Sequence, residues 1–381
     1  MHPIVILGTG LAGYNVAREL RKLDKSVPLV ILSADSGAFY SKPLLSSAIG
    51  AGKSAQALAM STAEQMAAQL GATVRRHAAV STIDTAAHTV TVGGETLAYA
   101  KLVLALGAEQ IRVPIAGDGA AAVVTVNDLD EYARYRELLK DGATVCLIGA
   151  GLIGSEFAND LAAGGHAPHA VDLAAWPLGR LLPQPAGELL GRRLAAAGVR
   201  WHFNTRVQSI VRAHGRLQVT LADGTDFTVD AALSAIGLRP RVALAQAAGL
   251  AVNRGIVVNR LHETSAPDVY ALGDCAEVDG MVLPYVMPIM HSARALGATL
   301  AGKSTPVAYP AMPIVVKTPA CPTVVAPPPA DAAGAWEITA DDAGVKALYR
   351  APDGRLLGFA LVGTAANERA ALTPQLPPVL A

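Results

Sequence analysis

The chain carries two copies of one short pattern, a glycine-rich turn between an apolar run and a helix-like segment, and this repetition constrains the fold more than any other feature. The first copy is "IVILGTGLAGYNVAREL", from Ile4, and the second is "VCLIGAGLIGSEFAND", from Val145. Each apolar run is rich in β-branched residues and predicts a buried parallel strand. The glycines follow the spacing GxGxxG in both copies: Gly8, Gly10 and Gly13, then Gly149, Gly151 and Gly154.

The glycine spacing has a chemical reason. The first glycine permits a tight turn, the second lets the backbone approach a pyrophosphate, and the third lets helix and strand pack closely. The helix N-terminus then offers free N–H groups and the positive end of its dipole to the phosphates. A single such motif is weak, because structural strand–helix turns also use glycine. Two copies, each with a strand before and a helix after, predict two dinucleotide sites.

An acidic residue about 20 positions after the fingerprint commonly binds a ribose. In the second copy this residue is Asp172, which favours NADH over NADPH because a carboxylate accepts from ribose hydroxyls and repels a 2′-phosphate. The alternative is that Asp172 only ends a strand in solvent. The first copy has Ser33 near this position and Asp35 two residues later, and the sequence does not decide which of them holds the ribose.

The bulk composition narrows the class of protein. A length of 381 residues allows two or three domains, and 52% hydrophobic against 16% charged residues suits large buried sheets. The 31 basic and 31 acidic residues balance, which argues against a nucleic-acid-binding protein. No uncharged apolar run is long enough to span a bilayer, so no membrane insertion is expected. The first strand begins almost at the N-terminus, so we expect no signal peptide and a cytoplasmic protein.

Further segments extend the two units. Strand-like runs occur at 27–37 and 101–109 for the first unit and at 166–174 for the second, and Pro43 interrupts a loop between them. Alternating patterns across 206–241 predict hairpins that cover the second unit. Prolines become frequent after Pro306, ahead of two more strand-like runs. We therefore predict an α/β fold with two Rossmann-like domains and a small α+β C-terminal domain.

These motifs together resemble the FAD-dependent pyridine nucleotide oxidoreductases across nearly the whole chain, and within them the bacterial rubredoxin reductases. The resemblance rests on "GTGLAGYN", "YSKPLLS", "GAGLIGSEFAND", "AIGLRPR", "YALGDCAEVDG" and "VKTPACP". It implies three-layer ββα nucleotide domains of the glutathione-reductase type. The implied division is an FAD domain at 1–112 and 234–306, an inserted NAD domain at 113–233 and a C-terminal interface domain at 307–381.

The resemblance also implies roles for individual residues. Those implied for FAD are Gly8, Thr9, Gly10, Leu11, Ala12, Gly13, Ser33, Ala34, Asp35, Lys42, Pro43, Val80, Asp274, Val286 and Met287. The second glycine-rich turn and its acidic residue are the candidates for NADH: Gly149, Gly151, Leu152, Ile153, Gly154 and Asp172. Gly237, in "AIGLRPR", is a further candidate cofactor-binding residue. Glu156 and Lys317 match catalytic positions beside the flavin ring, where a lysine could stabilise negative charge on reduced flavin. Alternatively, Lys42 is a solvated loop residue and Glu156 an ordinary charge in a first helical turn.

The three cysteines, Cys146, Cys275 and Cys321, form neither a CxxC nor a CxxxxC motif, and the loop around Pro43 contains none. Electrons must then pass from the flavin directly to an external acceptor. The resemblance implies a hydride transfer from NADH to tightly bound FAD, followed by one-electron transfers to rubredoxin, a small iron–sulfur carrier. Such a chain would feed an alkane hydroxylase or a similar pathway, and we expect a monomer.

Three other functions remain open from the sequence. A ferredoxin reductase would keep both cofactors and change the acceptor, although such relatives usually have a longer C-terminal domain. An NADH oxidase is disfavoured in its water-forming type by the absence of a loop cysteine. A non-catalytic dinucleotide sensor is disfavoured because the residues around both nucleotides are retained, including Asp274 and Lys317.

Overall fold

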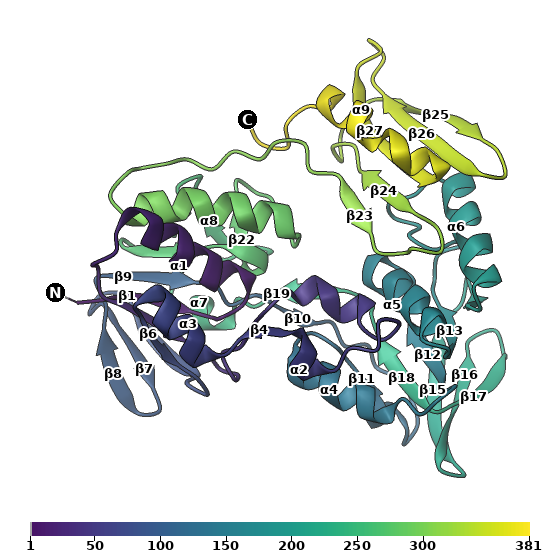
Figure 1. Ribbon diagram of the computed structural model, residues 1–381, viewed down its shortest axis with the longest axis horizontal. Helices are drawn as coiled ribbons and strands as arrows, with labels where there is room; N and C mark the ends of the chain where they lie inside the picture. The colour runs from purple at the N-terminus through teal and green to yellow at the C-terminus, as the bar shows by residue number, and fades with distance from the viewer. Residues whose placement is uncertain (1) are drawn as a thin grey trace.

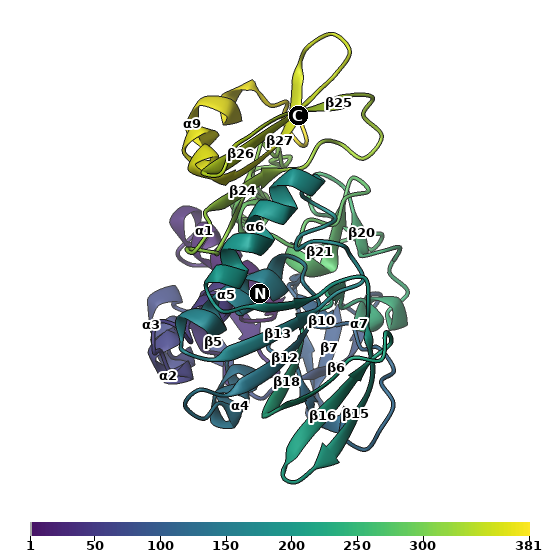
Figure 2. The same cartoon turned by 90° about the vertical axis from the view of Figure 1, so that its right-hand side faces the viewer.

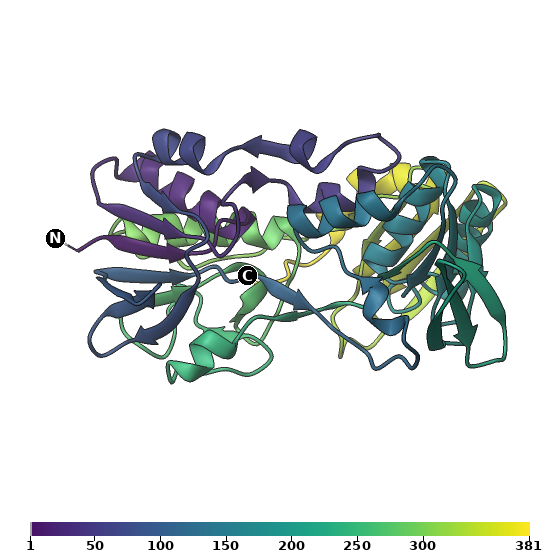
Figure 3. The same cartoon turned by 90° about the horizontal axis from the view of Figure 1, so that it is seen from below.

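A computed structural model describes residues 2–381, and its first unit is built on a five-stranded parallel sheet with the order β21-β9-β1-β2-β5 (Figure 1). These strands are β1 (Ile4–Leu7), β2 (Leu29–Leu32), β5 (Thr73–Arg75), β9 (Lys101–Leu104) and β21 (Val269–Ala271). Helices α1 (Leu11–Leu23) and α8 (Val286–Leu300) pack side by side on one face. The antiparallel strands β6 (Val80–Asp84), β7 (Thr89–Val92) and β8 (Glu95–Ala98) cover the other face, which gives three layers (Figure 3).

The second unit repeats this plan with the strand order β11-β18-β12-β13-β14. Its strands are β11 (Val123–Val124), β12 (Thr144–Ile148), β13 (Ala167–Val171), β14 (Arg200–His202) and β18 (Ala231–Ser234). Helices α5 (Leu152–Ala163) and α6 (Gln184–Ala196) pack on one face, and the antiparallel strands β15 (Val207–Ala213), β16 (Arg216–Leu221) and β17 (Asp226–Val229) on the other. The predicted pair of three-layer nucleotide-binding folds is confirmed.

One predicted hairpin region has a different structure. The residues of β18 were expected within hairpins, but they form a parallel strand next to β12 and are buried along their whole length. A strand covered on both faces is apolar throughout, so its sequence does not show the alternation of a hairpin strand. The hairpin expectation is correct for β15–β17, which are antiparallel.

The connection between the units is a two-stranded ribbon of β10 (Ala108–Gln110) and β19 (Leu238–Pro240). Shorter elements complete both units: β3 (Phe39–Tyr40), α2 (Ala55–Leu58), β4 (Ala59–Ser61), α3 (Ala63–Leu70), α4 (Leu129–Leu138), α7 (Ala243–Ala247), β20 (Ile256–Val258) and β22 (Ala276–Val278). The loop around Pro43 is regular rather than interrupted, since η1 (Lys42–Ser47) is a 3-10 helix with this proline in its first turn. Proline suits this position because its fixed φ matches a helix and its missing N–H would have no partner there.

The C-terminal residues form an antiparallel sheet with the order β23-β24-β27-β26-β25. Its elements are β23 (Ile314–Val316), β24 (Thr323–Ala326), β25 (Ala335–Ala340), β26 (Gly344–Arg350) and β27 (Leu356–Gly363), followed by α9 (Arg369–Leu372). The sheet packs on α6 of the second unit and shares its hydrophobic core (Figure 2). Both ends of this module return to the first unit, where Tyr309 and Leu380 pair.

The predicted domain limits remain a proposal. Ser234, the first residue assigned to the returning FAD segment, is the last residue of β18 in the second unit. No helix in residues 2–381 is long and apolar enough to cross a membrane.

Candidate functional site

The third glycine of each fingerprint is required for packing. A Cβ atom on Gly13 would lie 1.9 Å from the Gly8 carbonyl oxygen, and one on Gly154 would lie 1.9 Å from the Gly149 carbonyl oxygen. The first glycines have φ values of +116° and +102°, which favour glycine. All four therefore shape the turn between strand and helix, as the motif requires.

The middle glycines differ, because their surroundings are open. A Cβ on Gly10 or Gly151 would meet no heavy atom within 4 Å. Each is the N-cap of its helix, and no side chain caps α1 or α5. The first N–H groups of both helices, which belong to Leu11, Ala12, Leu152 and Ile153 among others, thus face a space that a pyrophosphate could fill. Both turns fit a dinucleotide.

The structure brings Thr9, Ser33 and Asp35 together at the ends of β1 and β2. The Thr9 and Ser33 hydroxyl oxygens are 2.5 Å apart, and Ser33 donates to Asp35 Oδ1 at 2.5 Å. The same carboxylate oxygen accepts from the Gly37 N–H at 2.8 Å. Ser33 is 2% exposed, whereas Asp35 and its neighbour Ala34 lie nearer the surface.

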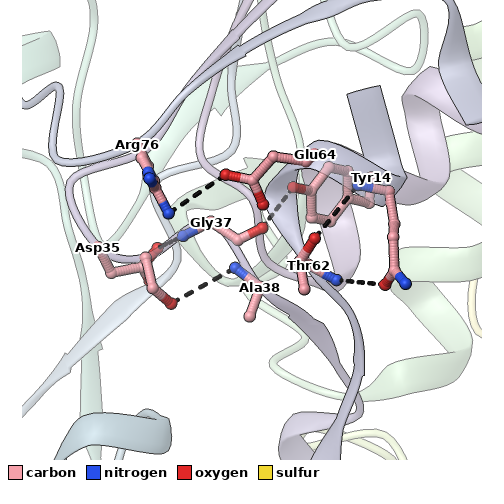
Figure 4. A network of polar contacts seen from close by, with 9 residues as sticks. Tyr14, Asp35, Gly37, Ala38, Thr62, Glu64 and Arg76 are labelled. Atoms are coloured by element: carbon pink, nitrogen blue, oxygen red, sulfur yellow. Dashed lines mark hydrogen bonds and ion pairs between the residues drawn. The ribbon is translucent and has the colours of Figure 1, made fainter. Parts of the chain in front are cut away.

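Neighbouring contacts hold the Asp35 turn in place (Figure 4). The Tyr14 hydroxyl donates to the Gly37 carbonyl at 2.5 Å, and Arg76 and Glu64 form an ion pair at 3.2 Å. The segment before β6 runs beside this turn, since the His77 and Ala78 N–H groups donate to Asp35 and Ser33 carbonyls at 2.9 and 2.6 Å. Val80 at the start of β6 is therefore close to the same turn.

The Asp172 side chain is hydrogen-bonded to the second glycine-rich turn, so this residue does not simply end a strand in solvent. Its Oδ2 accepts from the Ala150 N–H at 2.5 Å and its Oδ1 from the Ala174 N–H at 2.7 Å. Ala150 belongs to the second glycine-rich turn, so the carboxylate braces the residues predicted to face the phosphates. Each oxygen retains a further lone pair for a ribose hydroxyl.

Lys42 and Asp274 lie within electrostatic reach of each other, in partly buried positions. Burial lowers the pKa of the Lys42 ammonium, and the charge of Asp274 opposes that shift. Burial likewise raises the pKa of the Asp274 carboxyl, and the charge of Lys42 opposes it. Each group therefore helps the other to stay charged. Lys42 is not a freely solvated loop residue.

Glu156 is a buried residue that contacts several other segments, and it is not an ordinary charged residue in the first turn of a helix. It is 1% exposed and forms an ion pair with the Lys317 ammonium. It also accepts from the Lys317 backbone N–H at 3.0 Å and from the Ser46 hydroxyl at 2.6 Å. One carboxylate thus joins α5, η1 and the end of β23, and it fixes the position of the lysine.

The sequence interpretation missed two further residues on the same face of α5. Asp160 accepts from the Ile49 and Gly50 N–H groups at 2.9 Å, and Asn159 accepts from the Ala320 N–H at 3.1 Å. Both side chains are nearly buried. The sequence contained a signal for these two residues. Polar residues one helical turn apart in an otherwise apolar helix indicate a helix face that contacts polar groups of another segment.

Three predicted residues lie on other elements. Val286 and Met287 begin α8 and are 38% and 49% exposed. Gly237 precedes β19 with a φ of +123°, and its carbonyl accepts from the Ile111 N–H at 3.1 Å. Gly237 therefore lies on the connection between the two units.

Comparison with known proteins assigns the family. Residues 2–297 match the model described as "Pyridine nucleotide-disulphide oxidoreductase". The chain belongs to the pyridine nucleotide-disulphide oxidoreductase family. It is 49% identical to the rubredoxin-NAD(+) reductase of Alcanivorax borkumensis over all of both chains. It is 43% identical to that of Acinetobacter baylyi, covering 100% of this chain and 99% of the relative.

Two further comparisons concern the C-terminal module and the fold. Residues 306–376 match the model described as "Rubredoxin binding C-terminal domain". Among solved structures, the ferredoxin reductase for the CYP199A2 system of Rhodopseudomonas palustris superposes with a TM-score of 0.88 at 26% identity, covering 99% of this chain and 96% of that one. The family's use of a flavin and a nicotinamide nucleotide agrees with the two open glycine turns.

This pyridine nucleotide-disulphide oxidoreductase has no disulfide among its described residues. All three cysteines are buried and unpaired. Burial raises the pKa of Cys146 to about 12 and that of Cys275 to about 11, and it also raises the pKa of Cys321. Since the thiolate is the reactive form, none of them suits redox exchange at neutral pH.

Proposed function

We propose that the chain is an NADH:rubredoxin reductase that holds FAD. The match of residues 306–376 to a rubredoxin-binding domain carries the choice of acceptor, and the identity to the reductases of Alcanivorax borkumensis and Acinetobacter baylyi supports it. The absence of a bonded cysteine pair in residues 2–381 agrees with electrons that leave the flavin directly.

The first unit holds FAD. The N–H groups around Gly10 bind its pyrophosphate. The Asp35 carboxylate binds its ribose, because Thr9, Ser33 and Gly37 all donate to Oδ1 of this carboxylate while Ser33 is buried against it. Val80 flanks the adenine. Lys42, Pro43 and Asp274 face the ribityl chain and ring, and Val286 with Met287 covers the ring at the start of α8. The chemistry that FAD supplies when bound is acceptance of a hydride and release of electrons one at a time.

The second unit binds NADH. The N–H groups around Gly151 face its pyrophosphate, and Asp172 accepts from its adenosine ribose hydroxyls while bracing the turn through Ala150. Gly237 borders the path between the units. A 2′-phosphate would meet the Asp172 carboxylate directly, so NADPH is the poorer substrate.

Lys317 acts as the cation at the flavin. Glu156 accepts from both its ammonium and its backbone N–H, so the ammonium has a fixed position. A positive charge beside the ring stabilises the negative charge that reduction creates. Glu156 is thereby a positioning residue, acting through Lys317.

Anaerobic stopped-flow absorbance tests the proposal. The FAD-loaded protein is reduced with NADH and mixed with oxidised rubredoxin, with a plant-type ferredoxin, or with oxygen. Rapid reoxidation by rubredoxin alone is the expected result. Reoxidation by ferredoxin alone would favour a ferredoxin reductase, which the fold likeness to the Rhodopseudomonas palustris enzyme makes the second candidate. Reoxidation by oxygen alone would indicate an oxidase.

A further inference from the structure

A cavity of about 340 Å³ lies at the connection between the two units, and its lining includes none of the predicted site residues. Its walls come from the β10–β19 ribbon and from the segment before α4, including Gln110, Asn127 and Arg241. Small-molecule sites usually have volumes of about 300–1,000 Å³. The cavity thus has room for one half of a dinucleotide rather than for the whole.

Asn127 is the unusual residue in this cavity. It is 8% exposed, and its side-chain N–H donates to the Ala108 carbonyl at 2.9 Å. Its Oδ1 is buried and has no hydrogen-bond partner within residues 2–381. A buried acceptor without a donor costs about 1–3 kcal/mol, so such a group is usually paired or reserved for a ligand.

Neighbouring contacts fix the orientation of Asn127. The Glu131 carboxylate accepts from the Asn127 backbone N–H at 2.7 Å and from the Thr125 hydroxyl at 3.1 Å. Asp128 caps α4 through the Glu131 N–H at 2.7 Å. Because Glu131 is used in holding the loop, the Asn127 Oδ1 is the buried acceptor of this wall that has no partner within residues 2–381.

The cavity lies between the two predicted nucleotide sites. On one side, the Ile111 N–H donates to the carbonyl of Gly237, a predicted cofactor-binding residue that follows β18 of the second unit. On the other, the Arg241 N–H donates to the Gly107 carbonyl at 3.0 Å, and the charges of Arg241 and Glu131 both act on Lys42, on the expected flavin side. A group in this cavity would lie where the reacting ends of the two nucleotides must meet.

We propose that Asn127 is a positioning residue for the nicotinamide end of NADH, with its Oδ1 accepting from the carboxamide NH2. The carboxamide has an NH2 group that needs an acceptor and a carbonyl oxygen that needs a donor. On the cavity wall, Asn127 offers the acceptor and the side-chain amide of Gln110 offers the donor. Arg112 and Arg241, exposed at its rim, supply positive charge for the adjoining phosphate. The inference rests on the proposed function, because it requires NADH as the substrate.

Binding of NAD+ and of ADP-ribose to the FAD-loaded protein separates this role from others, because ADP-ribose lacks the nicotinamide. Calorimetric titration of Asn127→Leu should show NAD+ affinity reduced by roughly fivefold to tenfold, the loss of about one hydrogen bond. The affinity for ADP-ribose should stay within about twofold of the wild type. Thr125→Val, which perturbs the same loop through Glu131 but keeps the Asn127 amide, should change the NAD+ to ADP-ribose ratio by less than twofold.

Three results would overturn the assignment. Equal weakening of both ligands in Asn127→Leu would show loop distortion, and unchanged affinity for both would show that the amide contacts neither. A shifted flavin absorbance spectrum in Asn127→Leu without nucleotide would place the amide on the flavin instead. If the wild-type protein binds neither NAD+ nor ADP-ribose, the proposed function itself is refuted. This result differs from the three above, which overturn only the role of Asn127.

Discussion

Replacement of Lys317 with methionine should destabilise the protein, because it removes the cation from a carboxylate that water hardly reaches. The Glu156 side chain is 2% exposed and that of Lys317 is 28% exposed. Methionine keeps most of the length and the apolar stem of lysine. The variant leaves the carboxylate with two neutral donors, the backbone N–H of residue 317 at 3.0 Å and the Ser46 hydroxyl at 2.6 Å.

The magnitude follows from the burial of the pair. Removal of one partner from a fully buried pair costs about 3–5 kcal/mol, and exposed pairs contribute about 0–1 kcal/mol. Lys317 is more than a quarter exposed, and two hydrogen bonds to Glu156 remain, so we expect a loss of about 2 kcal/mol. With an unfolding entropy of about 2.1 cal/mol/K per residue, a chain of 381 residues loses roughly 1 °C per kcal/mol, so the melting temperature falls by about 2–3 °C. The double variant with Glu156→Gln should recover about 1 kcal/mol, since it leaves no unpaired buried charge.

Thermal unfolding of the wild type, both single variants and the double variant, each saturated with FAD, measures this coupling. The control is the exposed Lys346–Glu368 pair of the same C-terminal module, whose side chains are 34% and 45% exposed. Its corresponding cycle should give less than about 0.5 kcal/mol. If the effects of the Glu156 and Lys317 variants add to within the same margin, the reasoning from burial is wrong.

Further predictions test other parts of the structure. Gly10→Ala should fold but retain less FAD per chain than the wild type. Gly13→Ala should give little folded protein, because its Cβ would lie 1.9 Å from a carbonyl oxygen. If the two variants had the same flavin content and the same melting temperature, this reasoning would be contradicted. Asp172→Asn should raise the ratio of kcat/KM for NADPH to that for NADH by roughly tenfold, about 1.4 kcal/mol, and an unchanged ratio would remove Asp172 from the ribose site. Burial lowers the pKa of His262 to about 4, so between pH 6.5 and 4 the unfolded chain binds a proton that the folded protein resists. The free energy of unfolding should therefore keep its full value above pH 6.5 and decrease toward pH 4. In the His262→Phe variant, chemical denaturation should show a smaller decrease over the same pH range. Alkylation with iodoacetamide at neutral pH should leave acceptor reduction unchanged, because all three thiols are buried: Cys146, Cys275 and Cys321.

The parts of the site that were predictable from sequence are those fixed by local geometry. Gly8 is required by its positive φ and Gly13 by the Gly8 carbonyl oxygen five residues earlier, so their spacing alone identifies the turn. The position of Asp172 follows from the length of one helix and one strand. Strand β18 was misread because it directly follows the alternating strands β15–β17, although its own residues are buried on both faces and do not alternate.

The remaining residues depend on contacts between distant segments. Ser46 reaches Glu156 across 110 positions of sequence, and Lys317 reaches it across 161. The unpaired Oδ1 of Asn127 can be recognised only in the folded structure. The sequence identifies the residue as asparagine, but it does not show which hydrogen bonds its side chain forms. Sequence pattern marks α5 as having a polar face, but it does not give the partners of that face.

The contacts of the C-terminal module explain why Lys317 can hold one position between two separate units. The chain that carries it pairs with Leu380 at Tyr309, on the first unit, and enters β23 at Ile314. Five peptide steps cover at most about 18 Å, so this tether is short. Glu156 holds the same lysine to the second unit, and Arg193 donates to the Asp342 carbonyl at 2.7 Å farther along that interface. A change in the angle between the units would therefore strain the tether or the ion pair, and the ammonium stays fixed only while both contacts hold.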